Sequence, residues 1–142
     1  MRAAKGPEDG PGFAAIHAAR AELDGVDPSD SYEMTGLVDE FIEALAAAKA
    51  SGSLALRPVI ERDGRIAAYG KIEQWSEADG TVVYLLMGWT HPDYRALGYG
   101  SALLGWMEGE AAALGERDHP GSKQEYAANA SSTETGAARL LA

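Results

Sequence analysis

The sequence predicts one layered α+β domain over residues 1–142, with helices flanking a mixed, mainly antiparallel sheet. Three observations support this prediction. The chain of 142 residues has the length of one ordinary domain. Apolar residues recur at helical spacing in the first third of the chain and alternate in the middle. A second helical pattern then separates two strand-like segments, which is typical of layered folds.

The N-terminal third is interpreted as two helices. Residues 8–23 carry a sparse helical stripe of Phe13, Ile16 and Leu23. Residues 33–50 carry a denser stripe, formed by Val38, Phe41, Ile42 and Leu45. Ser-Gly-Ser at 51–53 ends the second helix, while Arg2-Ala3-Ala4 leaves almost no room for a strand before the first.

Residues 54–90 predict three strands in an antiparallel meander. Apolar residues alternate with polar ones, and Asp-Gly pairs at 63–64 and 79–80 mark two tight turns. The segment 81–90 is almost wholly apolar, so we expect it to be buried on both faces. Pro58 cannot donate to a strand ladder, which predicts that the first of the three strands is an edge strand or contains a bulge.

The C-terminal third predicts a helix, a strand and a final helix. The helix over 98–115 has one apolar side, made of Leu103, Leu104, Met107, Ala111 and Leu114. A short strand follows at 124–128 and a helix begins at 133–142. Because the helix over 98–115 is a crossover between two strands, strand 124–128 should run parallel to 81–90.

Charge and composition argue against several classes of protein. The formal charge is −10 and the pI is near 4.6, whereas nucleic acids and anionic membranes attract clustered Lys and Arg. No apolar run approaches the roughly 20 residues that span a bilayer. The absence of cysteine excludes disulfides and thiolate ligands, and fits a cytoplasmic protein. His17, His91 and His119 show no metal-ligand spacing, so no metal is expected.

The segment Thr90-His91-Pro92-Asp93-Tyr94-Arg95-Ala96-Leu97-Gly98-Tyr99-Gly100-Ser101 carries the chemistry, between a buried strand and a helix. Glycines let backbone N–H groups converge, and the helix N-terminus adds partial positive charge, so the segment can bind a phosphate or pyrophosphate. A dinucleotide fingerprint would need glycine at Leu103. A P-loop would need lysine after Gly100, where Ser101 stands.

The run Arg95-Ala96-Leu97-Gly98-Tyr99-Gly100, preceded by Pro92-Asp93-Tyr94, resembles the acyl-CoA pyrophosphate loop of the GNAT acetyltransferase superfamily. That loop has the pattern Arg/Gln-x-x-Gly-x-Gly/Ala and opens a helix after the fourth strand. The surrounding order of helices and strands also agrees, so the resemblance covers nearly the whole chain. It implies a GNAT acyl-CoA acyltransferase-like fold. The plain alternative is a glycine pair that serves only close packing, beside a solvated arginine.

The resemblance implies where acetyl-CoA binds. The pyrophosphate would lie on the amides of Arg95, Ala96, Leu97, Gly98, Tyr99, Gly100 and Ser101. The pantetheine arm would bond to strand backbone at Trp89 and Thr90, with residues 126–129 as the opposite wall. Asn129 matches an asparagine with which the family often bonds the arm, although a strand-end asparagine can also simply cap the next helix.

The implied activity is acetyl-CoA-dependent N-acetyl transfer, directly to a primary amine of a small molecule or peptide. Relatives often use a tyrosine as general acid where Leu141 stands here, and a glutamate on the strand that 81–90 matches, which has no carboxylate. Glu73 and His91 are the remaining weak candidates for a base, although each is better explained as an exposed strand or loop residue. The alternative function is a non-catalytic acyl-CoA-binding or dimerisation domain of the same fold.

Two further expectations concern partners. Relatives continue into two more strands, so the sequence predicts a fold that is incomplete at the C-terminus: a fragment, a part of a larger protein, or a sheet completed by a partner strand, for instance in a homodimer. Eight acidic residues and no basic one lie between Arg20 and Lys49, namely Glu22, Asp24, Asp27, Asp30, Glu33, Asp39, Glu40 and Glu43. This acidic segment would attract a cationic amine, or would serve only solubility.

Overall fold

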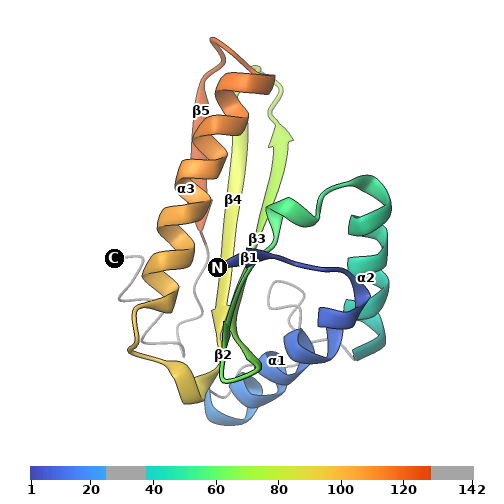
Figure 1. Ribbon diagram of the computed structural model, residues 1–142. Coiled ribbons are helices and arrows are strands. Elements are labelled where there is room, and N and C mark those ends of the chain that lie inside the picture. Colours follow the sequence, from blue (N-terminus) through green and yellow to red (C-terminus); the bar gives the residue numbers. More distant parts are fainter. Residues whose placement is uncertain (25–37, 129–142) are drawn as a thin grey trace.

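The computed structural model describes residues 1–24 and 38–128, which form a five-stranded sheet with helices on both faces (Figure 1). The main elements are β1 (Arg2–Ala3), α1 (Gly10–Asp24), α2 (Val38–Ser51), β2 (Pro58–Arg62), β3 (Arg65–Ser76), β4 (Val82–Thr90), α3 (Tyr99–Asp118) and β5 (Gln124–Ala128). Single 3-10 turns η1, η2 and η3 lie at Pro7–Asp9, Leu54–Leu56 and Pro92–Tyr94. The predicted α+β fold with a mixed sheet is confirmed. Asn129, Leu141, the start of the helix expected over 33–50 and the helix expected over 133–142 lie outside the described residues.

The sheet has the strand order β1-β2-β3-β4-β5. Neighbours from β1 to β4 are antiparallel, whereas β5 runs parallel to β4, in register from Val82↔Gln124 to Leu86↔Ala128. The predicted meander and the predicted parallel strand are therefore both confirmed. The predicted start of the first strand is wrong, because Leu54–Leu56 form the turn η2 and β2 begins only at Pro58. Asp63 and Gly64 have φ values of 54° and 74°, as expected for the tight turn of a hairpin.

Pro58 predicts that its strand is an edge strand or contains a bulge, and the structure confirms the bulge. Pro58 opens β2 and pairs with Ala3 of the two-residue strand β1, so β2 is not an edge at this point. The register between β2 and β3 shifts between Ile60 and Glu61, which places a bulge in the middle of the strand.

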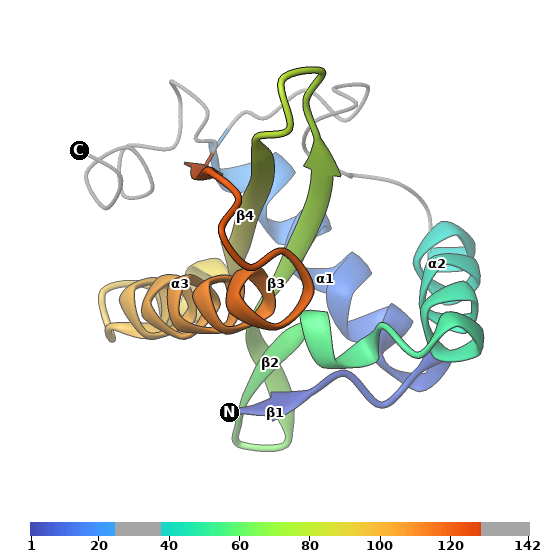
Figure 2. The same cartoon turned by 90° about the horizontal axis from the view of Figure 1, so that it is seen from above.

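Each face of the sheet has its own apolar core, because alternate residues of β3 and β4 point to opposite faces. One core lies under α1 and α2 and includes Phe13, Ile16, Phe41, Leu45, Tyr69 and Trp89. The other lies under α3 and includes Ile72, Tyr84, Leu86, Leu103, Met107 and Leu114. Figures 1 and 2 show α3 on one side of the sheet, with α1 and α2 on the other. Burial of β4 on both faces is thus confirmed.

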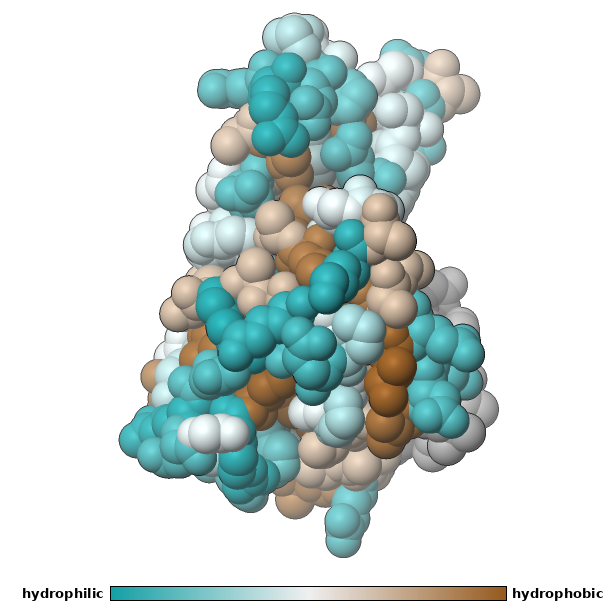
Figure 3. All heavy atoms as spheres, turned by 45° about the vertical axis from the view of Figure 1, so that its right-hand side comes forward, coloured by the Kyte–Doolittle hydropathy of each residue, from teal (hydrophilic) through white to brown (hydrophobic). Residues whose placement is uncertain are grey.

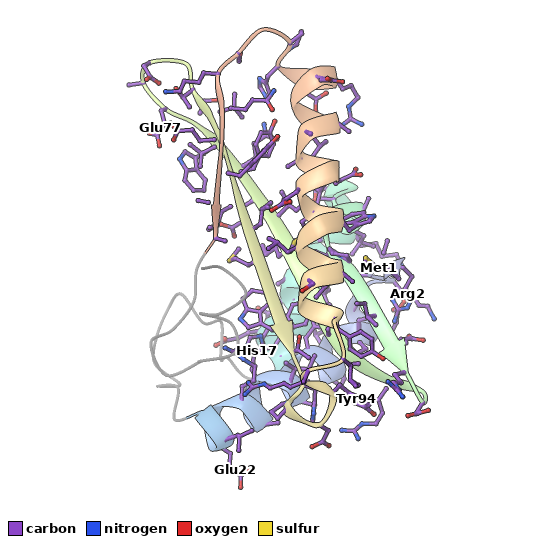
Figure 4. The ribbon with its side chains drawn as sticks, turned by 90° about the vertical axis from the view of Figure 1, so that its left-hand side faces the viewer. Met1, Arg2, His17, Glu22, Glu77 and Tyr94 are labelled. Carbon is purple, nitrogen blue, oxygen red and sulfur yellow. The ribbon has the colours of Figure 1, made fainter. Side chains whose placement is uncertain are left out.

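The apolar stripe expected on α1 is wrong at one position. Phe13 and Ile16 are buried, but Leu23 is 64% exposed, because the last turn of α1 projects past the sheet near Glu22 (Figure 4). His17 and Arg20 continue the buried face instead, at helical spacing from Phe13.

The stripe on α2 is confirmed at Phe41 and Leu45, whereas Val38 in its first turn is 42% exposed. On the side that carries α2, apolar side chains reach the surface in a band between hydrophilic ones (Figure 3). Leu54, Ile66 and Leu85 pack against this core while only partly buried. None of the helices in the described ranges is long and apolar enough to cross a membrane.

Candidate active site

The loop between β4 and α3 has two residues in the left-handed backbone region. Ala96 has φ 62°, and Gly98, the N-cap of α3, has φ 85° and ψ 5°. A Cβ built on Gly98 would meet no heavy atom within 4 Å, so the space in front of this glycine is open. Ala96 adopts a conformation that L-residues with a side chain disfavour by about 1–2 kcal/mol, and strain of this kind concentrates at binding sites.

The first turn of α3 presents backbone donors at this open space. The first intrahelical hydrogen bond runs from the amide of Ala102 to the carbonyl of Gly98, 3.0 Å away. The amides of Tyr99, Gly100 and Ser101 come before it, so they have no acceptor within the helix. Because Gly100 has no positive φ, only Gly98 needs glycine for its conformation. Such a helix N-terminus is suited to an anion such as a pyrophosphate.

The residues predicted for the pyrophosphate lie together in this loop. Leu97 is 49% exposed, and Ala96, Gly98 and Ser101 are also exposed. Tyr99 and Gly100 are half-buried. Arg95 is half-buried with extended backbone at the end of η3.

Trp89 and Thr90 lie at the end of β4 that leads into the loop. The Trp89 side chain is buried beneath α1, with its ring centroid 4.9 Å from that of Tyr69. Thr90 is half-buried opposite Ala68 of β3. Within the described ranges, β5 pairs with β4 only as far as Leu86, so the last residues of β4 lie beyond the paired region. The resemblance implies that backbone groups of Trp89 and Thr90 bind the cofactor arm, and this stays a prediction.

His91 has a structural role in shaping the loop. Its side chain caps η3, since Nδ1 accepts a hydrogen bond from the Asp93 amide at 3.1 Å. Its Nε2 lies 3.3 Å from a guanidinium nitrogen of Arg65. Burial, and the charges of Arg65 and Arg95, outweigh Asp93 and lower the pKa of His91. The ring is therefore neutral at pH 7, and its unprotonated nitrogen is already occupied as an acceptor.

Glu73 lies on β3, opposite Leu85 of β4 and away from the loop. Its side chain is 43% exposed, and a carboxylate oxygen lies 2.6 Å from Nζ of Lys71. The structure thus places the two weak candidate bases apart, His91 at the loop and Glu73 further along the sheet. In the described ranges, no group of three or more acidic or histidine side chains could hold a metal ion.

Sequence reasoning missed a buried polar chain beside Trp89. Arg20 can only donate, so its guanidinium nitrogen donates to Nδ1 of His17 at 3.1 Å, and Nε2 of His17 then donates to the Tyr69 hydroxyl. The His17 ring centroid lies 5.1 Å from that of Trp89. Burial and the Arg20 charge lower the pKa of His17 to about 3, and burial raises that of Tyr69. The helical spacing of Phe13, His17 and Arg20 was the sequence signal that could have shown this buried polar chain.

A match to a family model decides the relationship. Residues 17–119 match the model of the acetyltransferase (GNAT) family. The chain belongs to this family. A search of curated proteins finds no match.

Solved structures of GNAT proteins share the fold. A GCN5-related N-acetyltransferase from Sphaerobacter thermophilus superposes with a TM-score of 0.72 and 23% identity, over 99% of this chain and 40% of that protein. The protein yncA from Salmonella typhimurium, solved with its cofactor acetyl-CoA, superposes with a TM-score of 0.66 and 23% identity, over 98% of this chain and 73% of that protein. A Clostridium acetobutylicum protein solved with acetyl-CoA superposes with a TM-score of 0.63 and 17% identity, over 97% of this chain and 85% of that protein. The chain thus spans less than half of the Sphaerobacter protein.

Proposed function

We propose that this GNAT chain binds acetyl-CoA at the β4–α3 loop and transfers the acetyl group directly to a primary amine of a small molecule or peptide. The observation that carries the proposal is the left-handed Gly98, which caps α3 at the end of the loop from β4 and precedes the amides of Tyr99, Gly100 and Ser101, which have no helical acceptors. Acetyl-CoA in the structures of two neighbours supports the choice of cofactor. We include a cytoplasmic location in the proposal, in keeping with the absence of cysteine.

The open space at Gly98 fits a pyrophosphate, because a side chain at this position would occupy the approach to the amides. In the proposed complex, these amides and the Ser101 hydroxyl hold the pyrophosphate. The backbone of Trp89 and Thr90 holds the amide-containing arm with ladder-type hydrogen bonds. Asn129 is proposed as a further donor to the arm.

When bound, acetyl-CoA supplies an activated thioester, from which an attacking amine takes the acetyl group while the thiolate leaves. The chain's own contribution is orientation and polarisation. In the proposed complex, backbone N–H groups at the end of β4 stabilise negative charge on the thioester carbonyl oxygen. Burial of Trp89 against Tyr69 and His17 fixes this part of the strand, so the donors are preorganised.

The amine must lose a proton and the thiolate must gain one. His91 can accept a proton only by giving up the hydrogen bond that caps η3. Glu73 can accept one only by weakening its ion pair with Lys71. These two engagements favour the second candidate function, a non-catalytic acyl-CoA-binding or dimerisation domain.

Two measurements on one preparation test these functions. Titration with CoA measures binding, and thiol release from acetyl-CoA across a panel of amines, including polyamines and peptide N-termini, measures turnover. Binding with turnover for one class of amine supports the transferase. Binding without turnover supports the binding domain. Absence of binding refutes both the transferase and the acyl-CoA-binding domain and leaves only the dimerisation domain, which a measurement of oligomeric state tests.

A further inference from the structure

Two arginines from a distant part of the sequence contact the proposed cofactor loop. Arg62 ends β2 and Arg65 begins β3, on either side of the Asp63-Gly64 turn. A guanidinium nitrogen of Arg62 donates to the hydroxyl of Tyr99, the first residue of α3, at 3.1 Å. Figures 1 and 4 show this hairpin at the end of the sheet where α3 begins, beside Tyr94.

Arg65 packs against the other side of the same loop. Its guanidinium carbon lies 5.6 Å from the ring centroid of Tyr94, and a guanidinium nitrogen lies 3.3 Å from Nε2 of His91. The hairpin arginines therefore flank the loop, Arg62 at its helix end and Arg65 at η3.

The charges at this end of the molecule differ from the rest of the chain. Arg62 and Arg65, with side chains 48% and 54% exposed, lie near Asp63 and Asp93 only at 3.9 and 3.8 Å, the outer limit of an ion pair. The chain as a whole carries −10 and repels a polyanion. These weakly held guanidinium groups are thus able to exchange a distant carboxylate for a phosphate, which they bind through paired N–H donors.

We infer that Arg62 and Arg65 bind the 3′-phosphate on the ribose of CoA, so that the hairpin distinguishes CoA from dephospho-CoA. The inference rests on the proposed function, in which the α3 amides hold the pyrophosphate. The 3′-phosphate is a monoester that carries close to two negative charges at neutral pH. It needs side-chain cations of its own, because the amides of the first helical turn are directed at the pyrophosphate.

The test measures the affinities of the full chain for CoA and for dephospho-CoA at low salt. We expect the unaltered protein to bind CoA more tightly, and we expect Arg62→Gln combined with Arg65→Gln to weaken CoA binding about tenfold, the scale of two exposed charge-assisted contacts. Binding of dephospho-CoA should stay within about twofold. Added salt should shrink the difference between the ligands, because exposed charges are screened.

Three controls isolate the effect. Arg117→Gln removes an exposed arginine at the far end of α3 and should change neither affinity. Tyr99→Phe removes the hydrogen bond from Arg62 but keeps its charge, so the ratio of the two affinities should persist. Asp93→Asn removes a competing carboxylate and should tighten CoA binding selectively.

The outcomes separate this inference from the function on which it rests. If the double variant weakens both ligands equally, the arginines only shape the loop and the inference is overturned. An unchanged ratio overturns it as well. If the unaltered protein binds dephospho-CoA as tightly as CoA, the inference fails while the proposed function stands. If it binds neither ligand, the proposed function fails and the inference falls with it.

Discussion

Replacing Gly98 by valine separates backbone strain from loss of a ligand site, because the chain offers a matched control. Gly98 has φ 85° and Gly80, in the turn between β3 and β4, has φ 89°. A Cβ built on either glycine meets no heavy atom within 4 Å. Valine should therefore cost about 1–3 kcal/mol of folding free energy at both positions, since β-branched residues disfavour positive φ. For a chain of this size, the melting temperature should fall by about 3–9 °C in both variants.

The two variants should differ in CoA binding. At Gly98, a side chain and a displaced loop remove two or three charge-assisted hydrogen bonds to the pyrophosphate, which together are worth about 3 kcal/mol. This corresponds to a loss of affinity of about a hundredfold. Gly80→Val should bind CoA as the unaltered protein does. Isothermal titration calorimetry with CoA, beside circular dichroism melts, measures both quantities. If Gly98→Val binds CoA as tightly as Gly80→Val, the loop is not the pyrophosphate site.

Three further predictions follow from other residues. Ala96 has a positive φ, which glycine adopts without strain, so Ala96→Gly should raise the free energy of unfolding by up to about 1 kcal/mol. The dissociation constant for CoA should stay unchanged. A loss of stability would show that Ala96 is not strained. His17, with its pKa lowered to about 3, binds a proton below about pH 6.5 only when the chain unfolds. Stability should therefore fall by about 1.6 kcal/mol from pH 6.5 to 5, and denaturant titrations of His17→Gln should lack this pH dependence. Neutralising Asp24, Asp27 and Asp30 should raise the Michaelis constant for a cationic amine at low salt, and an unchanged constant would leave the acidic segment only its role in solubility.

Much of the fold could be predicted because short stretches of sequence determine its turns and the faces of its strands. Asp63-Gly64 supplies the two positive φ values that a tight hairpin requires, and alternation on either side fixes the faces of the strands. The parallel direction of β5 follows from the helix that connects it to β4. The buried face of α1 was predicted incompletely, because only apolar residues were assigned to it. His17 and Arg20 continue this face, since Arg20 bonds to His17 and His17 bonds to Tyr69.

The candidate site could be predicted only where its residues are consecutive. The loop around Gly98 forms one run of sequence, so its glycine spacing was visible. Arg62 contacts Tyr99, which lies 37 residues later in the sequence, and Arg65 contacts His91, which lies 26 residues later. No periodicity encodes such contacts, since they depend on how the β2–β3 hairpin and α3 meet at one end of the sheet. The roles of Glu73 and His91 likewise depend on their partners, Lys71 and the Asp93 amide.

The strand order has a consequence for how the molecule assembles. The β2–β3 and β3–β4 pairings close short loops and should form early, whereas the pairing of Arg2 with Val59 closes a loop of about 57 residues. The pairing of Val82 with Gln124 instead requires α3 to form and dock first, and it closes a loop of about 40 residues. We therefore expect β1 and β5 to join the sheet after the β2–β3–β4 meander has formed. A ligand bound at the end of β4 and present at a hundred times its dissociation constant would add about 2.7 kcal/mol to the stability of the folded state, and hydrogen exchange in β5 should slow.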